Sequence, residues 1–249
     1  MLFRSAFPQA NYVIVDQAVN AAGAIGQPRA AGLINAVLRN FCRGRASILQ
    51  RIDVSDKGRY HHPFWWLEKL KTIYPDCWRQ IVEINNGLAP MCLRINRRRT
   101  TPEQYLTRLQ AAGIAARPVA YEALILETPC RVEKLPGFLQ GEVSVQDAGA
   151  QRAAHYLDAK EGMRVLDACA APGGKSCHIL ELAKVNLTAL DISSRRGKRI
   201  EENLRRLNLQ AEVVINDVSR FANSMIGGQS FDRILIDAPC SASGVVRRH

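Results

Sequence analysis

The sequence contains no C-x-x-C pair, and its five histidines do not cluster at the spacing of metal ligands. Zinc sites built from neighbouring cysteines and histidines are therefore not predicted, and we expect no metal. The seven cysteines are an odd number scattered along the chain, so most of them are expected to be reduced and to behave as small buried side chains. Cys240, which follows a proline in a predicted loop, is the exception.

Long hydrophobic runs are missing as well. The longest uncharged stretch near the start, residues 17–28, is too short to cross a membrane, and no basic segment, apolar core and cleavage site follow Met1. With 249 residues, of which 47% are hydrophobic and 23% charged, the composition is that of a globular chain long enough for two domains. We therefore expect a cytoplasmic protein without a membrane span.

Acidic residues are scarce in the first hundred positions. These hold 15 Lys and Arg against 6 Asp and Glu, whereas the remaining residues hold 19 against 17, so most of the net charge of +11 lies in the first part. Such a segment can be a solvated basic surface, or it can contact the phosphates of a nucleic acid. The best candidates for phosphate contact are the run Arg39–Arg51 and the arginines at positions 94, 97, 98 and 99.

The sequence also lacks both common phosphate-binding patterns, G-x-G-x-x-G and G-x-x-x-x-G-K-[S/T]. Residues 165–175 read VLDACAAPGGK instead, which predicts a strand, a tight turn and a helix that begins near Lys175. Gly173 and Gly174 let the backbone approach a ligand closely, and the start of a helix offers N–H groups to polar or anionic atoms. Taken alone, the turn can also be purely structural.

Four predicted strands each end at an aspartate. They cover residues 165–167, 186–192, 211–217 and 231–237 and end near Asp167, Asp191, Asp217 and Asp237. Ligands bind at the carboxyl ends of parallel strands in open α/β sheets, so these side chains are expected to line one edge. Asp191 lies where an acid commonly binds ribose hydroxyls. The alternative is that each aspartate caps the helix that follows it.

These motifs resemble those of a known enzyme family. ACAAPGGK, LDIS, IND and DAPCSASG are similar to the motifs of the S-adenosylmethionine-dependent RNA cytosine-5 methyltransferases of the bacterial Fmu/Sun type, the 16S rRNA methyltransferase B family. The segments GLINAVLRNF, LRIN and VSVQDAGAQ extend the resemblance upstream. It implies an α/β fold, with a Rossmann-like methyltransferase core whose first four strands lie in the order 3-2-1-4.

The resemblance also divides the chain into three parts. Residues 1–87 are expected to be part of a NusB-like helical RNA-binding domain, residues 88–142 a small α+β RNA-binding subdomain, and residues 143–249 the N-terminal part of the core. Helical spacing of apolar residues from Leu33 to Phe41 supports the first assignment. The three tryptophans of this part are expected in its core rather than stacked on bases. Asp76 is expected to cap a helix that stops at Gly87.

In the small subdomain, residues 91–96 and 117–127 are expected to be strands. Between them, Thr101, Pro102 and Gln104 form the pattern of a capping box with proline at the first helical position. Residues 194–209 predict a basic amphipathic helix with Ile200, Leu204 and Leu207 inward and its arginines mostly solvated.

By the resemblance, the cofactor is S-adenosylmethionine, the partner is 16S rRNA, and the family's full-length members are monomers that methylate carbon 5 of a cytosine. The segment expected to wrap the methionine and ribose of the cofactor consists of Cys169, Ala170, Ala171, Pro172, Gly173, Gly174 and Lys175. Asp191 is expected to bind the ribose hydroxyls and Asp217 the adenine side. Asp237 is expected to lie between cofactor and base.

Cys240 has two interpretations. From the residues alone it is the obvious nucleophile, because a Pro-Cys pair follows a strand. In the family, the attacking cysteine belongs to a later Thr-Cys motif, and the Pro-Cys cysteine assists release of the enzyme. The sequence contains no Thr-Cys dipeptide. We therefore expect a chain that lacks both ends of the family pattern. An inactive RNA-binding remnant and a dinucleotide oxidoreductase are the alternatives.

Overall fold

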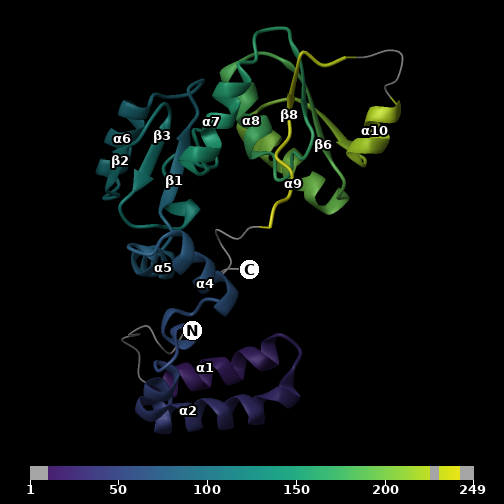
Figure 1. Ribbon diagram of the computed structural model, residues 1–249. Coiled ribbons are helices and arrows are strands. Elements are labelled where there is room, and N and C mark those ends of the chain that lie inside the picture. The colour runs from purple at the N-terminus through teal and green to yellow at the C-terminus, as the bar shows by residue number, and fades with distance from the viewer. Residues whose placement is uncertain (1–10, 225–229, 242–249) are drawn as a thin grey trace. The chain divides into compact units, whose positions relative to one another are not determined.

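The computed structural model describes residues 11–224 and 230–241 (Figure 1). The chain divides into two compact units, one that runs to Gly87 and one that begins at Leu88. Among the described residues, no helix has both the length and the apolar character needed to cross a membrane.

The first unit is helical, as predicted. Its elements are α1 (Asn11–Ala24), the short 3-10 helix η1 (Pro28–Ala30), α2 (Ala31–Ile52), α3 (Asp56–Tyr60), α4 (Phe64–Ile73) and α5 (Trp78–Asn86). Helices α1 and α2 lie side by side as a hairpin (Figure 1). Pro28 begins η1, which leads directly into α2. The predicted apolar face of α2 is only partly covered, since Leu33 is 69% and Val37 55% exposed.

Helices α3, α4 and α5 share a small core. Trp66 and Trp78 are buried in it together with Tyr60, whose ring meets that of Trp78 edge to face at 5.2 Å. The expectation that the tryptophans form core is thus confirmed for these two, whereas Trp65 is 52% exposed.

The prediction that Asp76 caps α5 is wrong. The helix begins at Trp78 with Cys77 at its cap position. The N–H groups of Cys77 and Trp78 donate to the carbonyl of Tyr74, at 3.2 and 2.9 Å. The preceding turn therefore satisfies these donors in place of a carboxylate.

An antiparallel sheet with one covering helix opens the second unit. Its elements are β1 (Met91–Ile95), α6 (Pro102–Ala111), β2 (Ala116–Pro118), β3 (Ala123–Leu126), the 3-10 helix η2 (Val132–Lys134) and β4 (Val143–Val145), with strand order β2-β3-β1-β4. The capping box at Thr101 and Gln104 is present, with both bonds at 3.3 Å. The single strand expected over residues 117–127 is instead two strands, because the chain turns at Tyr121, whose φ is +52°.

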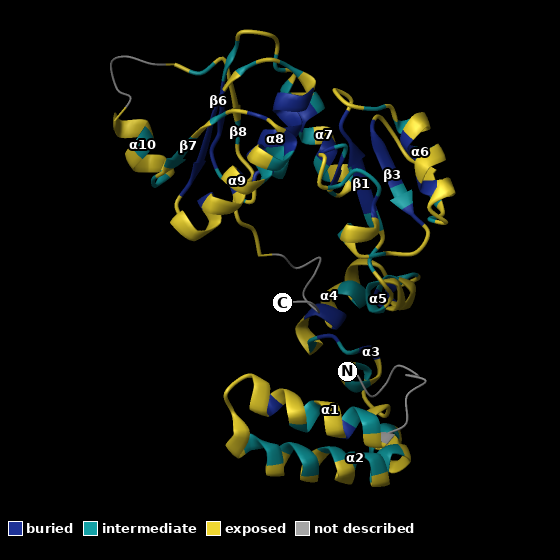
Figure 2. Ribbon diagram, turned by 180° about the vertical axis from the view of Figure 1, so that it is seen from behind, coloured by how far each residue is buried: buried dark blue, intermediate teal, exposed yellow. Residues whose placement is uncertain are grey.

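A parallel sheet flanked by helices follows. Its elements are α7 (Ala148–Leu157), β5 (Arg164–Asp167), α8 (Gly174–Leu182), β6 (Asn186–Asp191), α9 (Ser194–Leu207), β7 (Glu212–Ile215), α10 (Val218–Ser224) and β8 (Arg233–Leu235). The strand order β7-β6-β5-β8 confirms the predicted order. Strand β6 is buried, while α9 shows an exposed outer face (Figure 2). The inward residues predicted for α9 are all buried.

Strand β8 lies at one edge of this sheet and pairs, among the described residues, with β5. Ile234 of this strand is 52% exposed, and Ile236, just beyond the end of the strand, is 67% exposed. An apolar edge of this kind is a surface onto which another strand can pair.

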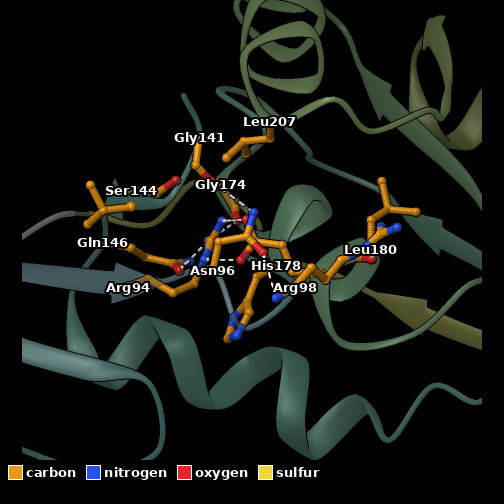
Figure 3. A network of polar contacts seen from close by, with 12 residues as sticks. Arg94, Asn96, Arg98, Gly141, Ser144, Gln146, Gly174, His178, Leu180 and Leu207 are labelled. Carbon is orange, nitrogen blue, oxygen red and sulfur yellow. Dashed lines mark hydrogen bonds and ion pairs between the residues drawn. The ribbon is translucent and has the colours of Figure 1, made fainter. Parts of the chain in front are cut away.

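The prediction that Arg94 contacts RNA phosphates is wrong. Its side chain is 1% exposed and forms a bidentate ion pair with Glu181 of α8, with Nε 2.9 Å from Oε2 and Nη2 2.8 Å from Oε1. Its Nη1 donates to Gln146 Oε1 and to the carbonyl of Gly174, both at 2.6 Å (Figure 3). Arg94 therefore joins strand β1 of the antiparallel sheet to the helix that follows β5.

Three further arginines support the same contact. Arg98 donates to the carbonyl of Leu180 at 3.3 Å, and Arg99 to that of Leu207 at 3.4 Å. Arg206 of α9, expected on a solvated face, instead donates to the carbonyls of Phe138 and Val143. Guanidinium groups on each side of this contact therefore donate to backbone carbonyls on the other side.

We predict that Arg94→Met destabilises the chain by about 3–5 kcal/mol, because it leaves the buried Glu181 carboxylate without its partner. Arg108→Met is the matched control: Arg108 pairs with Glu142, but its side chain is 44% exposed. A pair of that kind contributes roughly 0–1 kcal/mol. Urea denaturation measures both variants, and equal effects would contradict the account.

Candidate functional site

The segment from Ala168 to Gly174 lies at the carboxyl end of β5. The N–H of Ala168 donates to the carbonyl of Leu235, and that of Ala170 to the carbonyl of Leu190, both at 2.9 Å. The turn is closed by a bond from the Gly173 N–H to the Ala170 carbonyl at 2.6 Å. Residues 168–174, which we call the cradle, are thus tied to the strands on both sides of β5.

Gly173 is the position of the cradle that requires glycine. Its φ is +94°, and a Cβ built on it would lie 3.1 Å from the Cα of Ile200 in α9. A side chain there would meet both a strained backbone conformation and the backbone of a neighbouring helix. The glycine therefore lets the cradle pack closely against α9, and α8 begins at the next residue.

Asp167 ends β5 and is 1% exposed. Its Oδ2 accepts a hydrogen bond from Ser176 Oγ at 2.6 Å, while Oδ1 has no partner among the described residues. Burial raises the pKa of Asp167 to about 6, the Asp237 charge adds to this, and the Ser176 bond and the Lys175 charge oppose it. The Asp167 carboxyl, which lies beside the cradle, therefore changes its protonation state near pH 6.

Asp191 ends β6 and connects the cradle to α9. Its Oδ2 accepts from the N–H of Ala171 at 3.2 Å, and its Oδ1 from Arg196 Nη2 at 2.8 Å and from the N–H of Ser193 at 2.9 Å. The residue is 2% exposed. Arg196, which sequence analysis placed on a solvated face, therefore faces a candidate site residue. The contact could have been predicted from the sequence, because Arg196 follows Asp191 by five residues and lies in the first turn of a capped helix.

Asp217 caps α10. Its Oδ1 accepts from the N–H groups of Ser219 and Arg220, at 2.9 and 3.2 Å, so the capping alternative holds for this aspartate. Asp217 also lines a hollow of about 510 Å³ together with Ile192, Ile215, Asn216 and Arg220. The same carboxylate thus stands at the carboxyl edge of β7 and at the wall of a hollow.

Lys175 and Asp237 form an ion pair across the end of β8. Lys175 is therefore directed at the site rather than into solvent, with 20% of its side chain exposed, and Asp237 is 54% exposed. The loop continues to Cys240, which is exposed. Residues 242–244 of the predicted DAPCSASG motif lie outside the described residues.

Cys169 lies in the cradle and is half-buried. Burial raises the pKa of its thiol, and the charges of Asp191 and Asp167 raise it further. Because the thiolate is the reactive form of cysteine, these surroundings suit a structural residue and oppose a nucleophilic one.

A larger hollow of about 1720 Å³ lies at the opposite end of the sheet, where it is lined by Arg164, Asn186 and Glu212 at the starts of their strands. Ligands of open parallel sheets bind at the carboxyl ends of the strands. Position in the fold therefore favours the cradle over the larger hollow as the cofactor site.

Comparisons with known families match three stretches of the chain. Residues 154–249 match the model described as 16S rRNA methyltransferase RsmB/F, residues 62–133 the ferredoxin-like domain of RsmF/B-like methyltransferases, and residues 1–43 the NusB family. The chain belongs to the RsmB/F family of 16S rRNA methyltransferases.

Relatives of known name support this assignment. The chain is 49% identical over 241 residues to ribosomal RNA small subunit methyltransferase B of Vibrio cholerae and 48% identical over 241 residues to that of Serratia proteamaculans. Both alignments cover 96% of this chain but 55% and 56% of the relatives. The chain thus spans about half the length of the curated relatives it matches.

Solved structures support the fold. A methyltransferase homologue from Pyrococcus horikoshii is 27% identical, with a TM-score of 0.62 over 75% of this chain and 67% of the other. NSun6 from the same organism, solved with SFG, has a TM-score of 0.63 at 19% identity over 74% of this chain and 73% of its own, a likeness of fold alone. The Rossmann-like methyltransferase fold expected from the sequence is confirmed.

We predict that Asp167→Asn changes how stability depends on pH. Because the pKa of Asp167 is raised from 3.8 to about 6, its protonated form stabilises the fold below pH 3.8 and this contribution is lost as pH rises through about 6. Asparagine cannot ionise. The free energy of unfolding of the variant, measured in urea relative to that of the unchanged chain, should therefore rise by roughly 2 kcal/mol between about pH 4 and pH 7. A difference that does not vary with pH would contradict the burial argument.

Proposed function

We propose that this chain is part of an enzyme that uses S-adenosylmethionine to methylate carbon 5 of a cytosine in 16S rRNA. The observation that carries the proposal is the cradle at the carboxyl end of β5, held between β6 and β8 with Asp191 on one side and Asp237 on the other. Two relatives of known name are small-subunit rRNA methyltransferases. NSun6 of the same fold was solved with SFG, an analogue of S-adenosylmethionine.

The residues present fit such a cofactor. The buried Oδ1 of Asp167 has no partner among the described residues, so a polar ligand group there would satisfy it. When bound, the cofactor supplies an electrophilic methyl group. Asp191 would accept the ribose hydroxyls, and Asp217, at the wall of its hollow, would lie beside the adenine.

Cys169, Ala170, Ala171, Pro172, Gly173, Gly174 and Lys175 would surround the methionine and ribose parts. The Lys175 ammonium holds the Asp237 carboxylate at the end of β8. This ion pair would position Asp237 between the cofactor and the target base.

The base would be approached from the loop after β8, where Cys240 is exposed. Carbon 5 of cytosine becomes a nucleophile once a thiolate has added to carbon 6. After carbon 5 has taken the methyl group, loss of its proton to a base expels the thiolate from carbon 6. We assign Cys240 the release role of the family's Pro-Cys cysteine. The Thr-Cys motif that supplies the attacking thiolate in the family does not occur in this sequence.

RNA contact is assigned to basic side chains that remain exposed. Arg97 is exposed at the end of β1, unlike the buried Arg94. On α2, Arg39 and Arg43 are also exposed and donate to neighbouring asparagines of the same helix. Guanidinium groups placed in this way can contact phosphates without reading sequence.

We predict that the purified chain binds S-adenosylmethionine and that Asp191→Asn weakens the binding by at least about tenfold. A hydrogen bond to a charged group contributes about 1.5–3 kcal/mol, and 1.4 kcal/mol is tenfold in affinity. Isothermal titration calorimetry measures both, with circular dichroism to show that the variant is folded.

Asp158→Asn is the matched control, because Asp158 is 62% exposed at the end of α7, away from the cradle. Its affinity is expected to be unchanged. A folded chain that binds RNA but not the cofactor would favour the inactive remnant, and binding of a nicotinamide dinucleotide would favour the oxidoreductase.

A further inference from the structure

Three metal-binding side chains meet away from the cradle. Glu122 lies in the turn before β3, His155 on α7 and His178 on α8. Their ligand atoms all lie within 4.8 Å of one another, although Glu122 and His178 are 56 residues apart in the chain. Short-range spacing therefore gave no sign of this cluster, and the expectation of no metal rested on such spacing.

The two imidazoles converge on one carboxylate oxygen. His155 Nε2 lies 2.8 Å from Glu122 Oε1, and His178 Nε2 contacts the same oxygen. The rings are nearly perpendicular, at 82°, with centroids 5.4 Å apart. Both nitrogens thus approach the same carboxylate oxygen from different directions, which places the three candidate ligand atoms together.

The cluster is buried and incompletely satisfied. The side chains of Glu122 and His178 are each 1% exposed, and that of His155 is 20% exposed. Glu122 Oε2 and His178 Nδ1 have no hydrogen-bond partner within the described residues. A buried carboxylate oxygen without a donor is costly, so its presence points to a cation.

We propose that Glu122, His155 and His178 bind a divalent transition-metal ion, with Zn²⁺ as the ion that fits them best. Two imidazoles and one carboxylate are a known zinc ligand set, whereas Mg²⁺ and Ca²⁺ prefer oxygen ligands alone. Zinc lies about 2.0–2.2 Å from such ligands, so the ion would replace the present nitrogen–oxygen hydrogen bonds. The partly exposed side of His155 leaves a route for the ion to enter.

The ion would act as a structural clamp. Glu122 lies in the turn between β2 and β3 of the antiparallel sheet, whereas the two histidines belong to helices packed on the parallel sheet. Helix α8 also carries Glu181, the partner of Arg94. The site would therefore add a second link across the contact that Arg94 forms, and it stands independently of the proposed cofactor and reaction.

The test is a titration of the purified chain, first freed of metal with a chelator, with Zn²⁺ by calorimetry and with Co²⁺ by absorption. We expect one ion per chain and visible Co²⁺ bands without the sulfur-to-cobalt charge-transfer band that thiol ligands would give. Zn²⁺ should also raise the melting temperature, because an ion that binds only the folded state stabilises it.

His155→Gln is the main variant, since the amide can still donate to Glu122 while a good zinc ligand is lost. We expect Zn²⁺ affinity to fall by at least about 100-fold, more than the 10–100-fold cost of losing an outer partner of a ligand, and the melting temperature no longer to respond to Zn²⁺. Glu122→Gln should behave alike. Glu127, just after β3, is exposed, and Glu127→Gln should bind Zn²⁺ as the unchanged chain does.

Three results would overturn the proposal. They are a folded chain that binds no ion, equal affinity in His155→Gln, and a charge-transfer band that places the ion on cysteine. Should Glu122→Gln fail to fold, His155→Gln alone decides the question.

Discussion

The structure of the second unit depends on one buried ion pair, between Arg94 of β1 and Glu181 of α8. Both side chains are almost completely buried, at 1% and 2% exposure. Taking two charges out of water is costly, and the cost is offset only when geometry and additional hydrogen bonds are good. Here the pair is bidentate, and the remaining guanidinium nitrogen is satisfied by Gln146 and Gly174. The carbonyl of Gly174 is thereby fixed at the point where the cradle becomes helix.

The carboxylates at the edge of the parallel sheet also depend on their surroundings. Asp191 is balanced by Arg196, Asp237 by Lys175, and Asp167 by a raised pKa that favours its neutral form. Like charges crowded at one edge would repel one another, and two of the three are balanced by ion pairs. The edge can therefore hold several acids without unfolding.

Much of this could be predicted from the sequence, because its signals are local. The alternation of apolar runs with Asp and Gly predicted the parallel strands, the resemblance to the family implied their order, and the capping box at Thr101 was visible within four residues. Which polar side chains become buried could not be predicted from the sequence. Arg94 lies in a basic run and was assigned to phosphates, yet its partner Glu181 lies 87 residues further along the chain. The meeting of Glu122 with two histidines depends on the same long-range packing of one sheet on the other.

Hydrogen exchange of the backbone amides in the Arg94→Met variant tests the central claim most directly. If the ion pair fixes the start of α8, amides of residues 173–180 should exchange faster by a larger factor than those of β6, since local opening of the helix start would precede global unfolding. The Arg108→Met variant should leave both segments unchanged. Unaltered protection of α8, or an equal loss of protection in α8 and β6, would contradict the claim that Arg94 holds the cradle in place.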